Sequence, residues 1–131
     1  MFVRQSRKSI SLLTVPVTID KPVDGGRIEK HQIDVTYLIP HQDQLDEMLK
    51  GLRDGDDSVD LAAEVVKRVD KIQEEDGTRI VYSDPKGTVD SDEFIREVRD
   101  DIINVTYARA AIMRDFWKLV NGQRVGAKRG N

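Results

Sequence analysis

Two segments near the start of the chain alternate between apolar and polar residues. The apolar positions are Leu13, Val15, Val17 and Ile19 in the first segment, and Ile33, Val35, Tyr37 and Ile39 in the second. A period of two puts these side chains on one face of a strand. Between the segments, Pro22-Val23-Asp24-Gly25-Gly26 supplies residues that tolerate the positive φ of a tight turn. The pattern predicts an N-terminal β-hairpin, and Pro16 predicts that its first strand lies at an edge or carries a bulge.

After Pro40 the apolar spacing changes to the three or four residues of a helix. The turn Asp54-Gly55-Asp56-Asp57 divides this region, and its last residue can cap the helix that follows. We therefore expect two helices that form an antiparallel or angled pair. Their apolar stripes are Leu45, Met48, Leu49 and Leu52, then Leu61, Ala62, Val65, Val66 and Val69.

A capping box gives the clearest helix start, at about Ser91. Asp90 can cap this helix, Glu93 stands three residues on, and Val89 and Phe94 occupy the staple positions. Gly122 is expected to end the helix after it. The two apolar stripes are Phe94, Ile95, Val98, Ile102 and Val105, then Ile112, Met113, Phe116, Trp117 and Val120.

These elements together predict an α+β fold, with an N-terminal β-hairpin followed by a bundle of about four helices. Ile80-Val81-Tyr82 has the composition of a short extra strand. A chain of 131 residues fits one domain, residues 1–131, in which residues 1–8 and 123–131 are expected to be flexible tails.

The composition bounds the function. The 21 basic and 24 acidic residues nearly cancel to a net charge of -3, so no overall field attracts a polyanion and we expect no nucleic-acid partner. The chain has no cysteine, which excludes thiolate nucleophiles and disulfides. No run of about 18 apolar residues occurs, so we expect no membrane-spanning segment.

Polar clusters in the sequence fall short of known chemical motifs. Asp54, Asp56 and Ser58 begin like a calcium loop, but Val59 and Val65 stand where the glycine and the bidentate glutamate belong, which favours helix capping. Neither of the two histidines has a second ligand at helical spacing. The sequence therefore predicts no catalytic residue, no metal site and no cofactor, and so a protein that is not an enzyme.

The run from Glu74 to Asn131 favours partner binding. It combines two amphipathic helices with a basic tail. Phe116 is expected in the core, whereas Trp117 fits either a core or an interface position, because tryptophan is common in both. The candidate partner-binding residues are Phe94, Val98, Ile102, Met113, Trp117 and Val120.

The order of features in this run resembles the tail assembly chaperones of long-tailed bacteriophages. The features are Glu75-Asp76-Gly77, Ile80 to Ser83, Val89 to Phe94, Tyr107-Ala108-Arg109, Gly122 and the end Ala127 to Asn131. The resemblance implies a factor in the host cell cytoplasm that binds and solubilises the tape measure protein, recruits tail tube subunits and is absent from the mature virion. We also expect a homo-oligomer, in which several copies line the tape measure protein and the edge strand around Pro16 or the helical faces make the contacts between copies. The alternative is a structural tail or head-tail connector protein that is retained in the virion.

Overall fold

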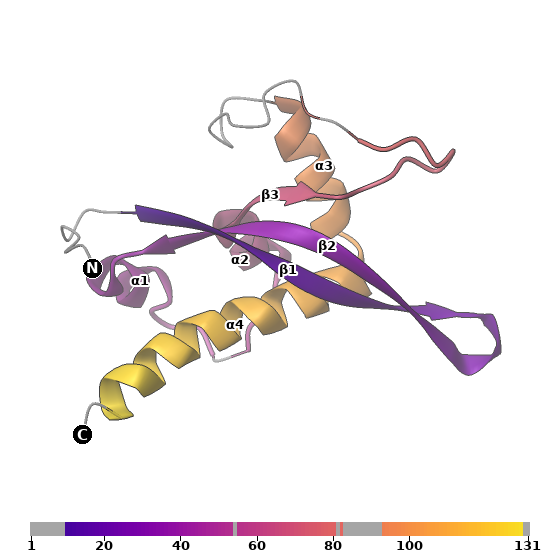
Figure 1. Ribbon diagram of the computed structural model, residues 1–131. Helices are drawn as coiled ribbons and strands as arrows, with labels where there is room; N and C mark the ends of the chain where they lie inside the picture. Colours follow the sequence, from indigo (N-terminus) through magenta and orange to yellow (C-terminus); the bar gives the residue numbers. More distant parts are fainter. Residues whose placement is uncertain (1–9, 54, 81, 83–92, 130–131) are drawn as a thin grey trace.

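A long β-hairpin forms the N-terminal part of the protein. The computed structural model describes residues 10–53, 55–80, 82 and 93–129. Strands β1 (Ile10–Val23) and β2 (Arg27–Pro40) pair antiparallel, and the 3-10 turn η1 (Asp24–Gly26) joins them. Gly25 has a φ of 83°, which few residues with a side chain adopt. The predicted hairpin is therefore confirmed (Figure 1).

A third strand, β3 (Val66–Asp70), pairs antiparallel with β2, so that the sheet order is β1-β2-β3. As Pro16 predicted, β1 is an edge strand. The helix predicted across positions 61–69 is wrong in its second half, because α2 (Val59–Val65) ends where β3 begins. Val66 and Val69 are β-branched and fully buried, and a strand lets them pack beside β2 while its backbone pairs with the open edge of that strand.

Four α-helices occur in the described residues, but the predicted bundle is not confirmed. In addition to α2 they are α1 (Gln42–Met48), α3 (Glu93–Ile103) and α4 (Thr106–Arg129). Helix α4 lies across the hairpin and packs mainly on β1, whereas α3 packs on β3 (Figure 1). The helix end predicted at Gly122 is wrong, since α4 continues to Arg129 and one glycine costs a helix only about 1 kcal/mol.

The segment after β3 contains a tight turn in place of the predicted extra strand. Gln73 and Arg79 form an isolated bridge around this turn, and neither Ile80 nor Tyr82 belongs to a strand. The predicted capping box and staple fall partly on residues 83–92, which lie outside the described residues. The predicted tail over residues 1–8 also lies outside them.

The main core lies between α4 and the inner face of the sheet. Tyr37 and Phe116 are fully buried there, with ring centroids 6.1 Å apart. The Tyr37 hydroxyl donates a hydrogen bond of 2.7 Å to the Ile112 carbonyl, which ties β2 to α4. Phe116 is thus a core residue, as predicted.

The far end of the hairpin extends past this core. Strand β3 pairs with β2 only between Asp34 and Tyr37, so residues 20–31 form a two-stranded projection that we call the arm (Figure 1). Almost all of its side chains are exposed, and Ile28 near the tip is 61% exposed. The arm leaves a hollow at its base, on the side of the helices.

Candidate functional site

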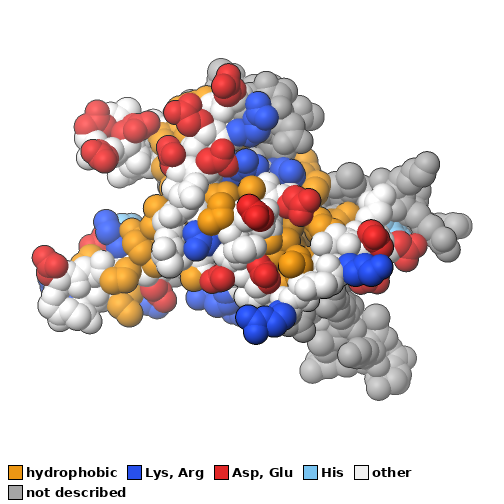
Figure 2. All heavy atoms as spheres, turned by 180° about the vertical axis from the view of Figure 1, so that it is seen from behind, with side chains coloured by type: hydrophobic (Ala, Val, Ile, Leu, Met, Phe, Trp, Pro, Cys, Tyr) orange, Lys and Arg blue, Asp and Glu red, His pale blue; other side chains and the backbone are white. Residues whose placement is uncertain are grey.

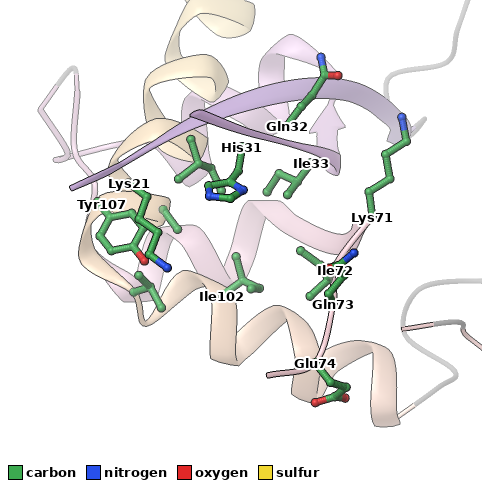
Figure 3. A pocket seen from close by; sticks show the side chains of 13 residues that line it. Lys21, His31, Gln32, Ile33, Lys71, Ile72, Gln73, Glu74, Ile102 and Tyr107 are labelled. Carbon is green, nitrogen blue, oxygen red and sulfur yellow. The ribbon is translucent and has the colours of Figure 1, made fainter. Parts of the chain in front are cut away.

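A pocket of about 540 Å³ lies at the base of the arm. Three parts of the chain enclose it: the hairpin, the segment that follows β3, and the corner between α3 and α4 (Figure 3). The corner is formed because α3 ends at Ile103 and α4 begins at Thr106, which turns the chain within two residues. The pocket is therefore built from segments far apart in the sequence.

Aliphatic side chains form the floor of the pocket. They come from all three segments, and the residues are Ile19, Ile33, Ile72, Ile102, Val105 and Ala108. Figure 2 shows apolar side chains reaching the surface in the hollow between the arm and the segment 71–79. An open apolar hollow is a common feature of sites that receive side chains of another protein.

Polar side chains surround this floor. Lys21 and Tyr107 are seen at one end of the pocket, Glu74 is seen at the other, and His31 points inward from β2 (Figure 3). The Nε2 atom of His31 lies 2.5 Å from Oε1 of Glu29 on the same strand. The rim thus offers groups of both charges to a bound molecule.

Lys71 determines how the chain leaves the sheet beside the pocket. Its φ of 67° lies in the left-handed region, which is unusual for a residue with a long side chain. The Lys71 ammonium lies 3.3 Å from Oδ2 of Asp34 on β2. This ion pair holds the start of the segment against the sheet while the segment itself diverges from β2.

The six candidate partner-binding residues do not share one surface. Val98, Met113, Trp117 and Val120 are at most 5% exposed, so their side chains lie in the core of this structure. The sheet and the neighbouring loop cover the apolar stripe of α4, whereas Val98 of α3 packs with Tyr82 and Ile95 in a second, smaller cluster. Ile102 is half-buried in the pocket floor, and Phe94 is 41% exposed on α3.

Trp117 and Arg109 fasten the loop before α2 to α4. The Trp117 indole donates a hydrogen bond of 2.8 Å to the Asp56 carbonyl, and Nε of Arg109 donates one of 2.7 Å to the Asp57 carbonyl. Trp117, which the sequence left open, is therefore a core residue with a polar anchor. The sequence carries no signal for the contact of Arg109, which joins residues 52 positions apart.

The acidic turn before α2 acts in helix capping. The Ser58 hydroxyl accepts a hydrogen bond of 3.3 Å from the Leu61 N–H. The Ser58 N–H in turn donates to the Asp56 carboxylate at 2.9 Å, which lowers the pKa of Asp56 below its ordinary value. Ser58 is thus the cap, one residue after the predicted position. Within the described ranges, no three metal-ligating side chains come together in a group that could hold a metal ion.

Among the described residues, no helix combines the length and the apolar character needed to cross a membrane. Comparison with protein-family models, with curated proteins and with solved structures gives no match.

Proposed function

We propose that this protein is a tail assembly chaperone of a long-tailed bacteriophage. In this role it binds the tape measure protein, keeps it soluble in the host cell cytoplasm and helps to recruit tail tube subunits. The observation that supports the proposal best is the pocket, because Ile72, Ile102 and Val105 of its aliphatic floor are only half-buried and charged side chains surround them. The identity of the partner, the tape measure protein, comes from the resemblance of the run from Glu74 to Asn131 to tail assembly chaperones.

The pocket suits a helical partner for a physical reason. A long amphipathic helix that is alone in water exposes an apolar stripe and tends to aggregate. A groove that receives the side chains of one helical face covers part of that stripe. The proposed binding surface is therefore the pocket that contains Ile102, in place of the whole stripes of α3 and α4.

Several copies of the chaperone would line one tape measure protein. No strand of the described residues pairs with the outer edge of β1, but Pro16 and Pro22 interrupt the row of N–H donors of this strand. Proline on an edge strand discourages the pairing of strands from different molecules. We therefore expect contacts between copies to use side-chain surfaces instead of a continuous sheet.

Co-expression with the tape measure protein of the same gene cluster tests the proposal. The wild type should raise the soluble fraction of the tape measure protein and co-purify with it. Ile102→Ser, in the pocket floor, should weaken both effects, whereas Ile28→Ser, on the arm tip, is the matched control and should not. Circular dichroism establishes that both variants are folded.

Two results would contradict the proposal. One is an unchanged solubility of the tape measure protein together with the absence of a complex for the wild type. The other is recovery of the protein in stoichiometric amounts from purified mature phage particles, which would favour the structural tail or head-tail connector protein.

A further inference from the structure

We infer that the pocket selects an amphipathic helix with an acidic residue on one side of its apolar anchor and a basic residue on the other. This inference rests on the proposed function, and it names the chemistry of the bound segment. It follows from Lys21 and Glu74, whose charged side chains lie at opposite ends of the apolar floor (Figure 3). A further lysine of the lining, Lys71, is already paired with the Asp34 carboxylate.

Lys21 is available to an acidic partner. Within the described part of the chain, its ammonium makes no hydrogen bond and no ion pair. Its cross-strand neighbour is Glu29, but that carboxylate is hydrogen bonded to His31. The other lysine at this level of the hairpin, Lys30, lies 3.9 Å from the Asp20 carboxylate. Lys21 therefore offers an unpaired positive charge beside the pocket.

Glu74 has the same property with the opposite sign. Its backbone N–H donates a hydrogen bond of 2.7 Å to the Thr78 carbonyl, which fixes the tight turn. Its side chain is exposed and makes no ion pair with the other described residues. Because the turn holds Glu74 at the rim, a basic side chain of a bound helix can pair with it as the helix docks.

The backbone of Lys71 keeps the two charges apart. Its left-handed conformation directs the following residues away from β2, and this divergence opens the pocket between Lys21 and Glu74. Unfavourable backbone conformations of this kind occur preferentially at functional sites. Lys71 is a long residue at a position that favours glycine, and its ammonium pairs with Asp34.

Because Lys21 and Glu74 have opposite charges, a helix with one acidic and one basic flanking residue should bind the pocket in only one of the two possible chain directions. Residues three or four positions apart share one face of a helix, so an apolar anchor and its flanking charges can all face the pocket. Charges on the rim of an interface act mainly on the association rate and on its dependence on salt. Reversing one of them should weaken binding by about tenfold at low salt and by less at high salt.

Binding of synthetic peptides tests the inference. Overlapping 25-residue peptides that cover the tape measure protein are measured by fluorescence anisotropy against the wild type, Lys21→Glu and Glu74→Lys. The matched controls are Lys30→Glu, on the arm but outside the pocket lining, and Glu75→Lys, next to Glu74. Peptides with the stated charges should bind, the two pocket variants should weaken them, and the two controls should not.

A charge-reversed peptide makes the test specific. Exchanging the acidic residue of a bound peptide for lysine should weaken its binding to the wild type and restore binding to Lys21→Glu. Peptides that bind equally to all variants would overturn this inference and leave the proposed function intact. A complete absence of binding would count against both. Self-association of the protein that Lys21→Glu abolishes would identify a second copy as the occupant and overturn the inference.

Discussion

Tyr37→Phe isolates the buried hydrogen bond that joins the sheet to α4. The Tyr37 side chain is fully buried, and its hydroxyl donates to the Ile112 carbonyl at 2.7 Å. Phenylalanine keeps the ring and its packing but removes this donor. One intramolecular hydrogen bond contributes about 1 kcal/mol net, so the free energy of unfolding at pH 7 should fall by about 1 kcal/mol.

The same hydroxyl should make the free energy of unfolding depend on pH in the alkaline range. Burial, together with the charge of Asp115, raises the pKa of Tyr37 well above its ordinary value, although Arg114 offsets part of this rise. Above about pH 10 the unfolded chain releases the proton while the folded protein retains it. The stability that the neutral hydroxyl contributes is therefore fully present below pH 10 and declines above it, by about 1.4 kcal/mol per pH unit.

The hydrogen bond of Tyr37 and the raised pKa of its hydroxyl have opposite effects on the difference in stability between the wild type and Tyr37→Phe as the pH rises. At pH 7 the wild type should be more stable than Tyr37→Phe by about 1 kcal/mol. At pH 11 the wild type has lost about 1.4 kcal/mol that the variant does not lose, so the difference should vanish or change sign. Urea unfolding followed by circular dichroism at pH 7, 9, 10 and 11 measures it.

A matched control is available in Tyr107→Phe. Tyr107 is 37% exposed at the pocket rim, so Tyr107→Phe removes a phenolic hydroxyl from the surface and leaves the buried hydroxyl of Tyr37 in place. A difference between wild type and Tyr37→Phe that stays constant from pH 7 to pH 11 would refute the reasoning. It would mean that water or a backbone shift accommodates the tyrosinate in the folded protein.

Three further predictions concern the backbone, a buried cation and a surface carboxylate. Lys71→Gly should be more stable than Lys71→Ala by about 1 kcal/mol in urea unfolding, since both remove the ion pair but only glycine relieves the left-handed strain. Arg99→Ala should cost about 2 to 3 kcal/mol, and Arg99→Lys should not restore it, because the guanidinium donates to the Ala63 and Val66 carbonyls. Hydrogen bonds from the side chain and the backbone of Thr78, of which the side-chain bond has the larger effect, lower the pKa of Asp76. Thr78→Val removes the side-chain bond and should raise this pKa in an NMR titration. In the wild type, the stability that the ionised Asp76 contributes should be lost as the pH falls through its folded-state pKa.

The hairpin was predictable because its signals are local. Alternating apolar residues, two glycines in the turn and one proline on the edge each act within a few positions, and the structure contains all three features. Helices α3 and α4 were predictable for the same reason, since their stripes repeat every three or four residues. The boundary between α2 and β3, at Val65 and Val66, has no such local signal, because a run of apolar residues fits a buried strand as well as a helix.

The tertiary structure decided which apolar residues became core. Met113, Trp117 and Val120 have the same pattern in sequence as an interface stripe, but α4 lies on β1 and buries them. Ile102 remains accessible because the chain turns at the α3–α4 corner and the arm diverges from the segment after β3. Whether an apolar side chain is buried depends on how closely helices and strands pack together, and the local sequence pattern contains no information on that packing.

By itself, the sequence determined the hairpin, its edge strand, the helical character of the C-terminal half and the nearly balanced charge. Only the tertiary structure decided that β3 completes the sheet, that α4 covers it, and that Lys21 and Glu74 lie at opposite ends of one pocket with an apolar floor. The physical reason is the range of the interactions. Backbone preferences and turn residues act between neighbours, whereas strand pairing and packing join residues that are tens of positions apart.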